Sequence, residues 1–228
     1  MNELTEAEEY NNKGLIKARQ KDYQKAIEYF TKALKLEPNN EYACIKRGDV
    51  RSYIEDYQGA IEDFTKAIEL EPENEYAYMS RGDARSYIED YQGAIEDYTK
   101  LIELDSNYTI AYINRGYIKS KLKDYQGALK DYIKAIELEE SYIGNYLNII
   151  EIFIITEKYK DAINWIEKTK DLKKDFKEDA IIKWFSCIVH LMTNKEMLKS
   201  EKDFEIAISN DFTFTTWSFE EIKAWTNN

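Results

Sequence analysis

The chain has 228 residues, and its 44 acidic and 32 basic side chains leave a formal net charge of −12. A chain of this length can bury enough surface to fold without disulfides or a metal, and its two cysteines, Cys44 and Cys187, offer no disulfide framework. The acidity disfavours nucleic acid as a partner, because affinity for phosphate backbones comes from Lys and Arg. Residues 1–6 show no leader pattern, and no stretch approaches the ~20 apolar residues of a membrane span. We therefore expect a cytoplasmic protein without membrane contact.

A period of 34 residues organises the first part of the chain. Residues 41–74 and 75–108 align without a gap and are identical at 24 of 34 positions. The same frame extends back to 7–40 and forward to 109–142, where glycine, alanine and aromatic residues stay in register. A fixed period of this size indicates stacked structural units. We predict four clear repeat units.

Two helices are predicted in each unit. In 41–74, apolar residues recur at helical spacing on both sides of a break at 55–57. Small residues such as Gly48 and Ala60 let the two helices approach, and Phe64 fills the space between them. The predicted fold class is therefore all-α, built from antiparallel helix pairs.

The positions that recur at this period resemble those of a known family. In the second unit they are Gly48, Tyr57, Ala60, Phe64, Ala67 and Pro72. The pattern resembles the tetratricopeptide repeat (TPR) family. The resemblance implies a right-handed superhelix, an α-solenoid whose first helices line a concave groove. One departure is systematic, since Arg47, Arg81 and Arg115 precede the glycine where the family usually has an apolar residue.

Beyond residue 142 the repeat signal weakens. Two degenerate TPR-like helix pairs are predicted at 143–176 and 181–214, separated by a slip of four residues. Residues 215–228 contain the Ser-x-x-Glu start of a capping box, which predicts a C-terminal capping helix. Such an atypical element covers the last apolar face of a solenoid.

Residues 146–155 are apolar nearly all round a helix, which is unusual for a solenoid helix with one solvated face. We expect this helix to be covered by the C-terminal segment, through Trp217, Phe219 and Trp225, or by a second subunit. The second possibility would make the protein a homodimer.

Catalysis has no support in the sequence. His190 is the only histidine, and with Cys187 it forms at best a pair. Phosphate-binding glycine loops and the HExxH zinc motif are absent from the sequence. We expect no enzyme activity, no cofactor and no metal site.

Arginines and aspartates recur at the same period on opposite helices of each unit. The first helices carry Arg47, Arg81 and Arg115, with Arg51 and Arg85 one turn further on, and the second helices carry Asp63, Asp97 and Asp131. Two interpretations are open. One is an ion-pair lattice in which the arginine heads are neutralised, and the other is an anion-binding strip.

The TPR resemblance assigns a ligand-facing side to the first helices of units two to four. The ten groove residues predicted on it are Tyr42, Lys46, Asp49, Tyr53, Tyr76, Ser80, Asp83, Tyr87, Asn114 and Tyr117. Tyrosines supply contact area with a polar handle, whereas Tyr57, Tyr91 and Tyr125, at the turns, are interpreted as packing between helices. Asp49 and Asp83 are expected to make the groove floor acidic.

These patterns predict a non-enzymatic protein–protein interaction module whose TPR groove binds a peptide segment of a partner protein, one with basic and aromatic side chains. The Lys and Asn positions of the chaperone-binding clamp are not matched, so the tail of a heat-shock chaperone is not expected. Residues 41–108 carry 17 acidic and 7 basic side chains, and this local excess would steer a cationic partner. The alternative is a self-assembling structural scaffold, a homo-oligomer formed through 146–155 or through the repeat ends.

Overall fold

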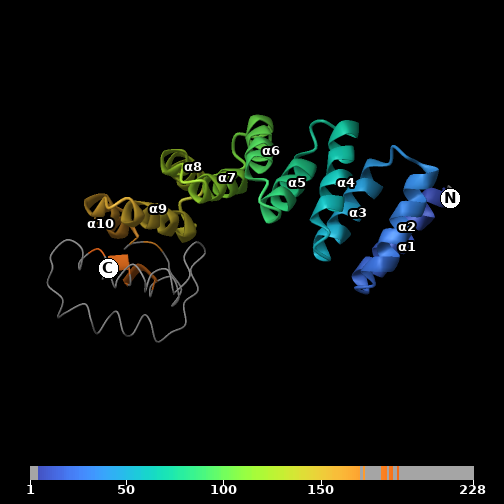
Figure 1. The fold of residues 1–228 in the computed structure, drawn as a ribbon, viewed down its shortest axis with the longest axis horizontal. Coiled ribbons are helices and arrows are strands. Elements are labelled where there is room, and N and C mark those ends of the chain that lie inside the picture. Colours follow the sequence, from blue (N-terminus) through green and yellow to red (C-terminus); the bar gives the residue numbers. More distant parts are fainter. Residues whose placement is uncertain (1–4, 170–171, 173–180, 184, 187–188, 190–228) are drawn as a thin grey trace. The chain divides into compact units, whose positions relative to one another are not determined.

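A computed structural model of the chain describes residues 5–169, 172, 181–183, 185, 186 and 189. Two compact units divide the chain, Met1–Ile118 and Lys119–Asn228. The helices found in the described residues are α1 (Glu6–Arg19), α2 (Tyr23–Leu36), α3 (Glu41–Tyr53), α4 (Tyr57–Leu70), α5 (Glu75–Tyr87), α6 (Tyr91–Leu104), α7 (Thr109–Lys121), α8 (Tyr125–Leu138), α9 (Ile143–Ile155) and α10 (Tyr159–Lys168) (Figure 1).

Helix hairpins build the N-terminal unit. α1 packs on α2, α3 on α4 and α5 on α6, and contacts between α2 and α3 and between α4 and α5 join consecutive hairpins (Figure 1). Each hairpin occupies one 34-residue period. The fold class predicted from the periodicity is confirmed.

In the hairpins of the N-terminal unit, a glycine on the first helix allows the two helices to approach. A Cβ atom added at Gly48 would lie 2.8 Å from Cε1 of Phe64, and one added at Gly82 would lie 2.8 Å from Cε1 of Tyr98. Both rings are 1% exposed, so they could not move aside without leaving the core. The packing role predicted for the glycine is confirmed.

Side-chain caps and a left-handed turn residue set the ends of the helices. Asn40 and Asn74 accept hydrogen bonds from the backbone N–H groups of Ala43 and Ala77, both at 2.9 Å. Such caps satisfy donors that a helix N-terminus leaves unpaired. Between the two helices of a hairpin one residue has a positive φ. Among the described residues these are Lys21, Glu55, Glu89, Lys123 and Glu157. They recur every 34 residues, so the period continues into a fifth hairpin, α9 with α10.

The C-terminal unit replaces the charged positions of the repeat with apolar ones. The residues concerned are Ile149, Phe153 and Trp165, which stand one period after Arg115, Lys119 and Asp131. Ile149 is fully buried and packs with Ala128 and Tyr132 of α8, and Phe153 and Trp165 pack against the same cluster. This substitution explains why α9 is apolar nearly all round.

Several parts of the chain cover α9. Ile150 and Ile154 pack with α10 and with Ile182, Phe185 and Val189. Trp217, Phe219 and Trp225, the capping helix expected at 215–228 and most of the pair expected at 181–214 lie outside the described residues. In the part of the chain that the structure describes, no helix is both long and apolar enough to cross a membrane.

Candidate functional site

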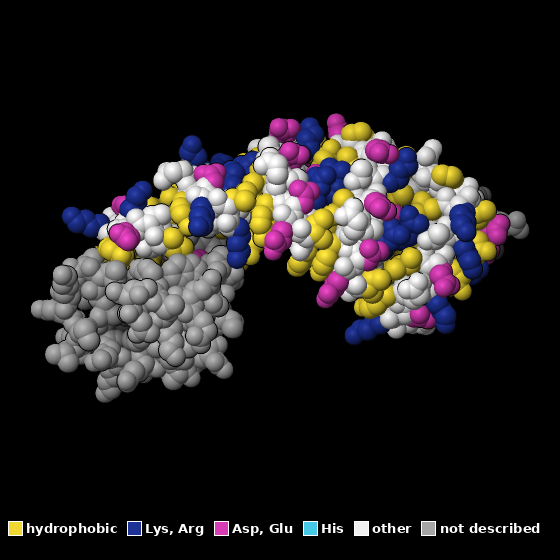
Figure 2. Space-filling model, in the orientation of Figure 1, with side chains coloured by type: hydrophobic (Ala, Val, Ile, Leu, Met, Phe, Trp, Pro, Cys, Tyr) yellow, Lys and Arg dark blue, Asp and Glu magenta, His cyan; other side chains and the backbone are white. Residues whose placement is uncertain are grey.

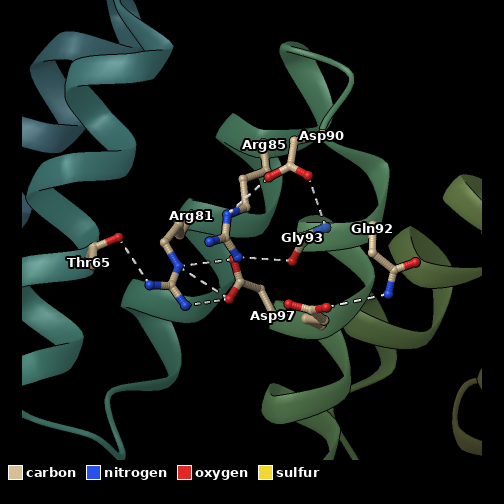
Figure 3. Close-up of polar contacts among 8 residues, drawn as sticks. Thr65, Arg81, Arg85, Asp90, Gln92, Gly93 and Asp97 are labelled. Carbon is tan, nitrogen blue, oxygen red and sulfur yellow. Dashed lines mark hydrogen bonds and ion pairs between the residues drawn. The ribbon is translucent and has the colours of Figure 1, made fainter.

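Buried ion pairs tie the helices of the third repeat together. Nη2 of Arg81 lies 2.6 Å from Oδ1 of Asp97, and Nη1 of Arg85 lies 2.9 Å from Oδ2 of the same carboxylate (Figure 3). Arg81 also donates from Nη1 to Oγ1 of Thr65 on α4, at 3.0 Å. Asp97 is 2% exposed, so both of its oxygens find charged donors inside the protein. Arg81 therefore links α4, α5 and α6.

The same network occurs one period earlier. Arg47 and Arg51 reach the two oxygens of Asp63 at 2.5 and 2.9 Å, and Arg47 donates to Thr31 at 3.0 Å. A buried carboxylate that accepts two guanidinium groups satisfies the requirement that buried charges be paired. In these repeats the ion-pair lattice is the interpretation that the structure confirms. It holds α3 and α5, the helices that carry most of the predicted groove residues.

A hollow of about 320 Å³ opens between α3 and α5. Its lining consists of Asp49, Ser52, Tyr53, Tyr57, Phe64, Tyr76, Ser80, Asp83, Ala84 and Tyr87. Six of the ten predicted groove residues are among them. The sequence interpretation missed Phe64 and Tyr57, which come from the second helix. The sequence did carry a signal for Phe64. Because Gly48 and Phe64 recur in register, Phe64 was predicted to fill the space between the two helices, which places its ring beneath the first helix.

A second hollow of about 510 Å³ lies one repeat further on. Its lining consists of Asp83, Ser86, Tyr87, Glu89, Tyr91, Tyr98, Asn114, Tyr117 and Ile118. Most of these residues stand 34 positions after a residue that lines the first hollow. Asp83 and Tyr87 line both hollows, so the two share a wall. Asn114 and Tyr117, also predicted for the groove, lie in the second.

Exposed tyrosines form much of the surface around the first hollow. Tyr53 and Tyr87 are 74% and 69% exposed. Their rings stack on Tyr23 and Tyr57, with centroids 5.9 and 4.7 Å apart. Tyr57 is therefore more than packing between helices, since it also lines the hollow. In Figure 2 tyrosine has the same colour as the hydrophobic residues. Side chains of this colour are exposed beside charged ones on the drawn face of the N-terminal unit.

Tyr42 and Lys46, the two remaining predicted residues, do not line either hollow. Lys46 donates from Nζ to Oδ2 of Asp49 at 2.8 Å, and its Nζ lies 5.8 and 5.5 Å from the ring centroids of Tyr42 and Tyr76. The hydroxyl of Tyr76 donates to Oδ1 of Asp49 at 2.8 Å. Burial, helped by this hydrogen bond, raises the pKa of Tyr76 to about 12. The charge of Asp49 is therefore matched within the chain.

Asp83 has different surroundings. Its Oδ1 accepts hydrogen bonds from the hydroxyl of Tyr98 at 2.7 Å and from Nδ2 of Asn114 at 3.1 Å. Burial raises the pKa of Asp83, and these two hydrogen bonds oppose the rise. Burial and the nearby Asp83 carboxylate also raise the pKa of Tyr98, which keeps it a donor. Of the two carboxylates expected to make the groove floor acidic, only Asp83 has no cation beside it among the described residues.

Among the described residues, no three His, Cys, Asp or Glu side chains are grouped so that they could hold a metal ion. Cys44 is a buried free thiol whose pKa is raised, chiefly by burial. The tyrosine-lined hollows and their carboxylates are features of the N-terminal unit that can contribute to recognition.

Family models for the tetratricopeptide repeat match residues 7–40, 45–108 and 109–142. The chain belongs to the tetratricopeptide repeat family. The resemblance inferred from the recurring positions is thereby confirmed, and with it the general role of the TPR fold as a protein-interaction module. No curated protein sequence matches the chain.

Solved TPR structures share the fold. A crystal structure of MamA is 27% identical, with a TM-score of 0.66, and the match covers 68% of this chain and 91% of that one. YrrB, described as a TPR protein with an unusual peptide-binding site, is 21% identical with a TM-score of 0.64, covering 74% and 87%. The first TPR of Spaghetti (RPAP3), bound to the HSP90 peptide SRMEEVD, is 26% identical with a TM-score of 0.50, covering 53% and 96%.

Proposed function

We propose that the N-terminal unit is a non-enzymatic module that binds a peptide segment of a partner protein in the two hollows along α3, α5 and α7. The observation that carries this proposal is the hollow of about 320 Å³ bordered by Tyr53, Tyr76 and Tyr87. Its volume lies at the lower end of the range of ligand sites. Exposed tyrosines held by stacking supply large contact area at low entropic cost. Peptide binding by the Spaghetti TPR agrees with this use of the fold.

The chemistry of the hollow favours a basic and aromatic segment. Two aspartates and no lysine or arginine are among the residues that line the first hollow. Residues 41–108 add an excess of acidic over basic side chains, which attracts cations and repels anions at moderate salt. An acidic tail such as SRMEEVD is therefore a poor match for this surface.

Selection from a random-peptide library on the full chain, followed by calorimetry with the enriched peptides, tests the proposal. The variant for comparison carries Tyr53→Ala and Tyr87→Ala. Loss of two aromatic anchors is expected to weaken binding by about 10- to 100-fold. Tyr142→Ala is the matched control, because Tyr142 is 49% exposed and lies in neither hollow. Equal affinity of wild type and the double variant would place the binding surface elsewhere.

The burial of α9 counts against one of the two surfaces named for the scaffold alternative. Residues Ile149, Ile150, Ile152 and Ile154 of α9 are buried within the chain, so this helix offers few apolar side chains to a second copy. For this alternative, association through the repeat ends is the better supported route. Mass measured by light scattering over a wide concentration range tests it: we propose a monomer, and a mass that rises with concentration would restore the scaffold.

A further inference from the structure

The second repeat contains a cation site that is occupied by its own lysine. Lys46 Nζ lies 2.8 Å from Oδ2 of Asp49 and within 6 Å of the ring centroids of Tyr42 and Tyr76. An ammonium group against tyrosine faces gains cation–π attraction, and the carboxylate adds a charge-assisted hydrogen bond. The side chain of Lys46 is 31% exposed, so the site is partly shielded from water.

The third repeat keeps the carboxylate and loses the lysine. Asp83 stands at the position of Asp49, and Ser80 replaces Lys46. Both hydrogen bonds that Asp83 accepts reach Oδ1, and no described residue donates to Oδ2 or forms an ion pair with this carboxylate. Because Asp83 is half-buried, its ionised form lacks part of the solvation that a surface aspartate has.

Tyrosine rings and this carboxylate line one hollow. Tyr53, Tyr76 and Tyr87 line the same hollow as Asp83. Stacking on Tyr23 and Tyr57 holds two of these rings in place. Rings that are already oriented lose little entropy when a ligand arrives. The apolar ring surfaces suit an aliphatic stem, and the carboxylate suits a cationic head.

We propose that Asp83, with Tyr53, Tyr76 and Tyr87, forms a subsite for a lysine or arginine side chain of the bound segment. The proposal rests on the proposed function, since it names which part of the peptide the first hollow takes. It also makes the second and third repeats unequal. In the second repeat Lys46 already pairs with Asp49, whereas in the third repeat Asp83 can pair with a cation of the partner.

The test uses four capped pentapeptides, Ala-Ala-X-Ala-Ala, in which X is lysine, arginine, norleucine or glutamate. Each is titrated into the full chain while the tyrosine ring resonances are followed by NMR. The lysine and arginine peptides are expected to bind with millimolar affinity and to shift the ring signals of Tyr53 and Tyr87. A charged hydrogen bond in a half-buried site is expected to make the norleucine peptide about tenfold weaker.

Two variants test the charge of Asp83 and the lack of an internal cation beside it. Asp83→Asn keeps an acceptor for Tyr98 and Asn114 but removes the charge, and Ser80→Lys supplies an internal cation in the register of Lys46. Each is expected to weaken the lysine peptide about tenfold, to the level of the norleucine peptide. Lys46→Ser is the reciprocal control, because it vacates Asp49 and is expected to add a second cation site.

The outcomes separate this proposal from the function on which it rests. Equal binding of the lysine and norleucine peptides, or lysine binding that survives both Asp83→Asn and Ser80→Lys in folded protein, would overturn the cation subsite. If library-selected peptides still depend on Tyr53 and Tyr87 in that case, the groove function stands alone. If cation binding is present but selected peptides ignore the two tyrosines, the subsite stands and the groove function fails.

Discussion

The second and third repeats, residues 41–74 and 75–108, share 24 of 34 residues and the same buried framework. The distances from Asp63 and Asp97 to their arginines differ by at most 0.1 Å between the two repeats. Their groove carboxylates nevertheless differ: Asp49 is paired with Lys46, and Asp83 is held by the neutral donors of Tyr98 and Asn114. Duplication thus preserved the framework, while a few substitutions changed the surface.

Removing the buried carboxylate of the arginine–aspartate network should lower the stability of both repeats by the same amount. Asp63→Ala and Asp97→Ala each leave two arginines without their acceptor, and each is expected to lower the free energy of unfolding by about 3–5 kcal/mol. Urea unfolding followed by circular dichroism measures the loss. Glu62→Ala, on the exposed side of α4, is the control and should change little. A large difference between the two aspartates would mean that the repeats are not equivalent in their cores.

The glycine positions should also respond alike, with a smaller effect. Gly48→Ala and Gly82→Ala introduce a Cβ that must displace the ring of Phe64 or Tyr98. Overpacking of this kind is expected to cost about 1–3 kcal/mol, less the gain in helix propensity from alanine. Thermal unfolding of the two variants measures it. Either variant proving more stable than wild type would show that the helices can separate at no cost.

Exchanging the aromatic residue beneath the groove should break the symmetry. Tyr98→Phe removes a hydrogen bond of 2.7 Å to Asp83 and is expected to cost about 1–2 kcal/mol. Phe64→Tyr adds a hydroxyl in the register of Tyr98, so its effect is expected to stay within about 1 kcal/mol. Chemical denaturation of both variants gives the comparison. Equal costs for both would mean that the Tyr98 hydroxyl does not stabilise Asp83.

The smallest effect expected is a difference in sign between Asp49→Asn and Asp83→Asn. Because burial raises the pKa of Asp83 in the folded state, ionisation of Asp83 destabilises the fold. The penalty is absent below the pKa of the unfolded chain, close to the ordinary aspartate value of 3.8, and is complete above the folded pKa. Asp83→Asn should therefore stabilise the chain at pH 7 but not at pH 3. The titratable and amide side chains that line the two hollows together with Asp83 are Asp49, Tyr53, Tyr57, Tyr76, Tyr87, Glu89, Tyr91, Tyr98, Asn114 and Tyr117.

Asp49→Asn should act in the opposite direction. It removes the ion pair with Lys46, which is partly exposed, so the expected loss of stability is about 0.5–1 kcal/mol at pH 7. Thermal unfolding of both variants between pH 3 and pH 8 measures the two effects together. A destabilising Asp83→Asn at pH 7 would contradict the contrast drawn between the two carboxylates.

Much of the fold and part of the groove could be predicted because they repeat. The 34-residue period, the glycine that faces Phe64 and the arginine–aspartate register follow from spacing on helices. Eight of the ten predicted groove residues line one of the two hollows. Tyr57 and Tyr98 were missed because they belong to second helices, which the predicted groove did not include.

The sequence by itself determined the repeat, the helix pairs and the positions at which charges recur, since these depend on local periodicity. Only the tertiary structure decided which charges are already matched. Lys46 reaches Asp49 and the ring of Tyr76 on the next repeat, and apolar residues of α8 and α10 bury the face of α9. Such contacts join residues on different helices, and their geometry follows from how the helices pack.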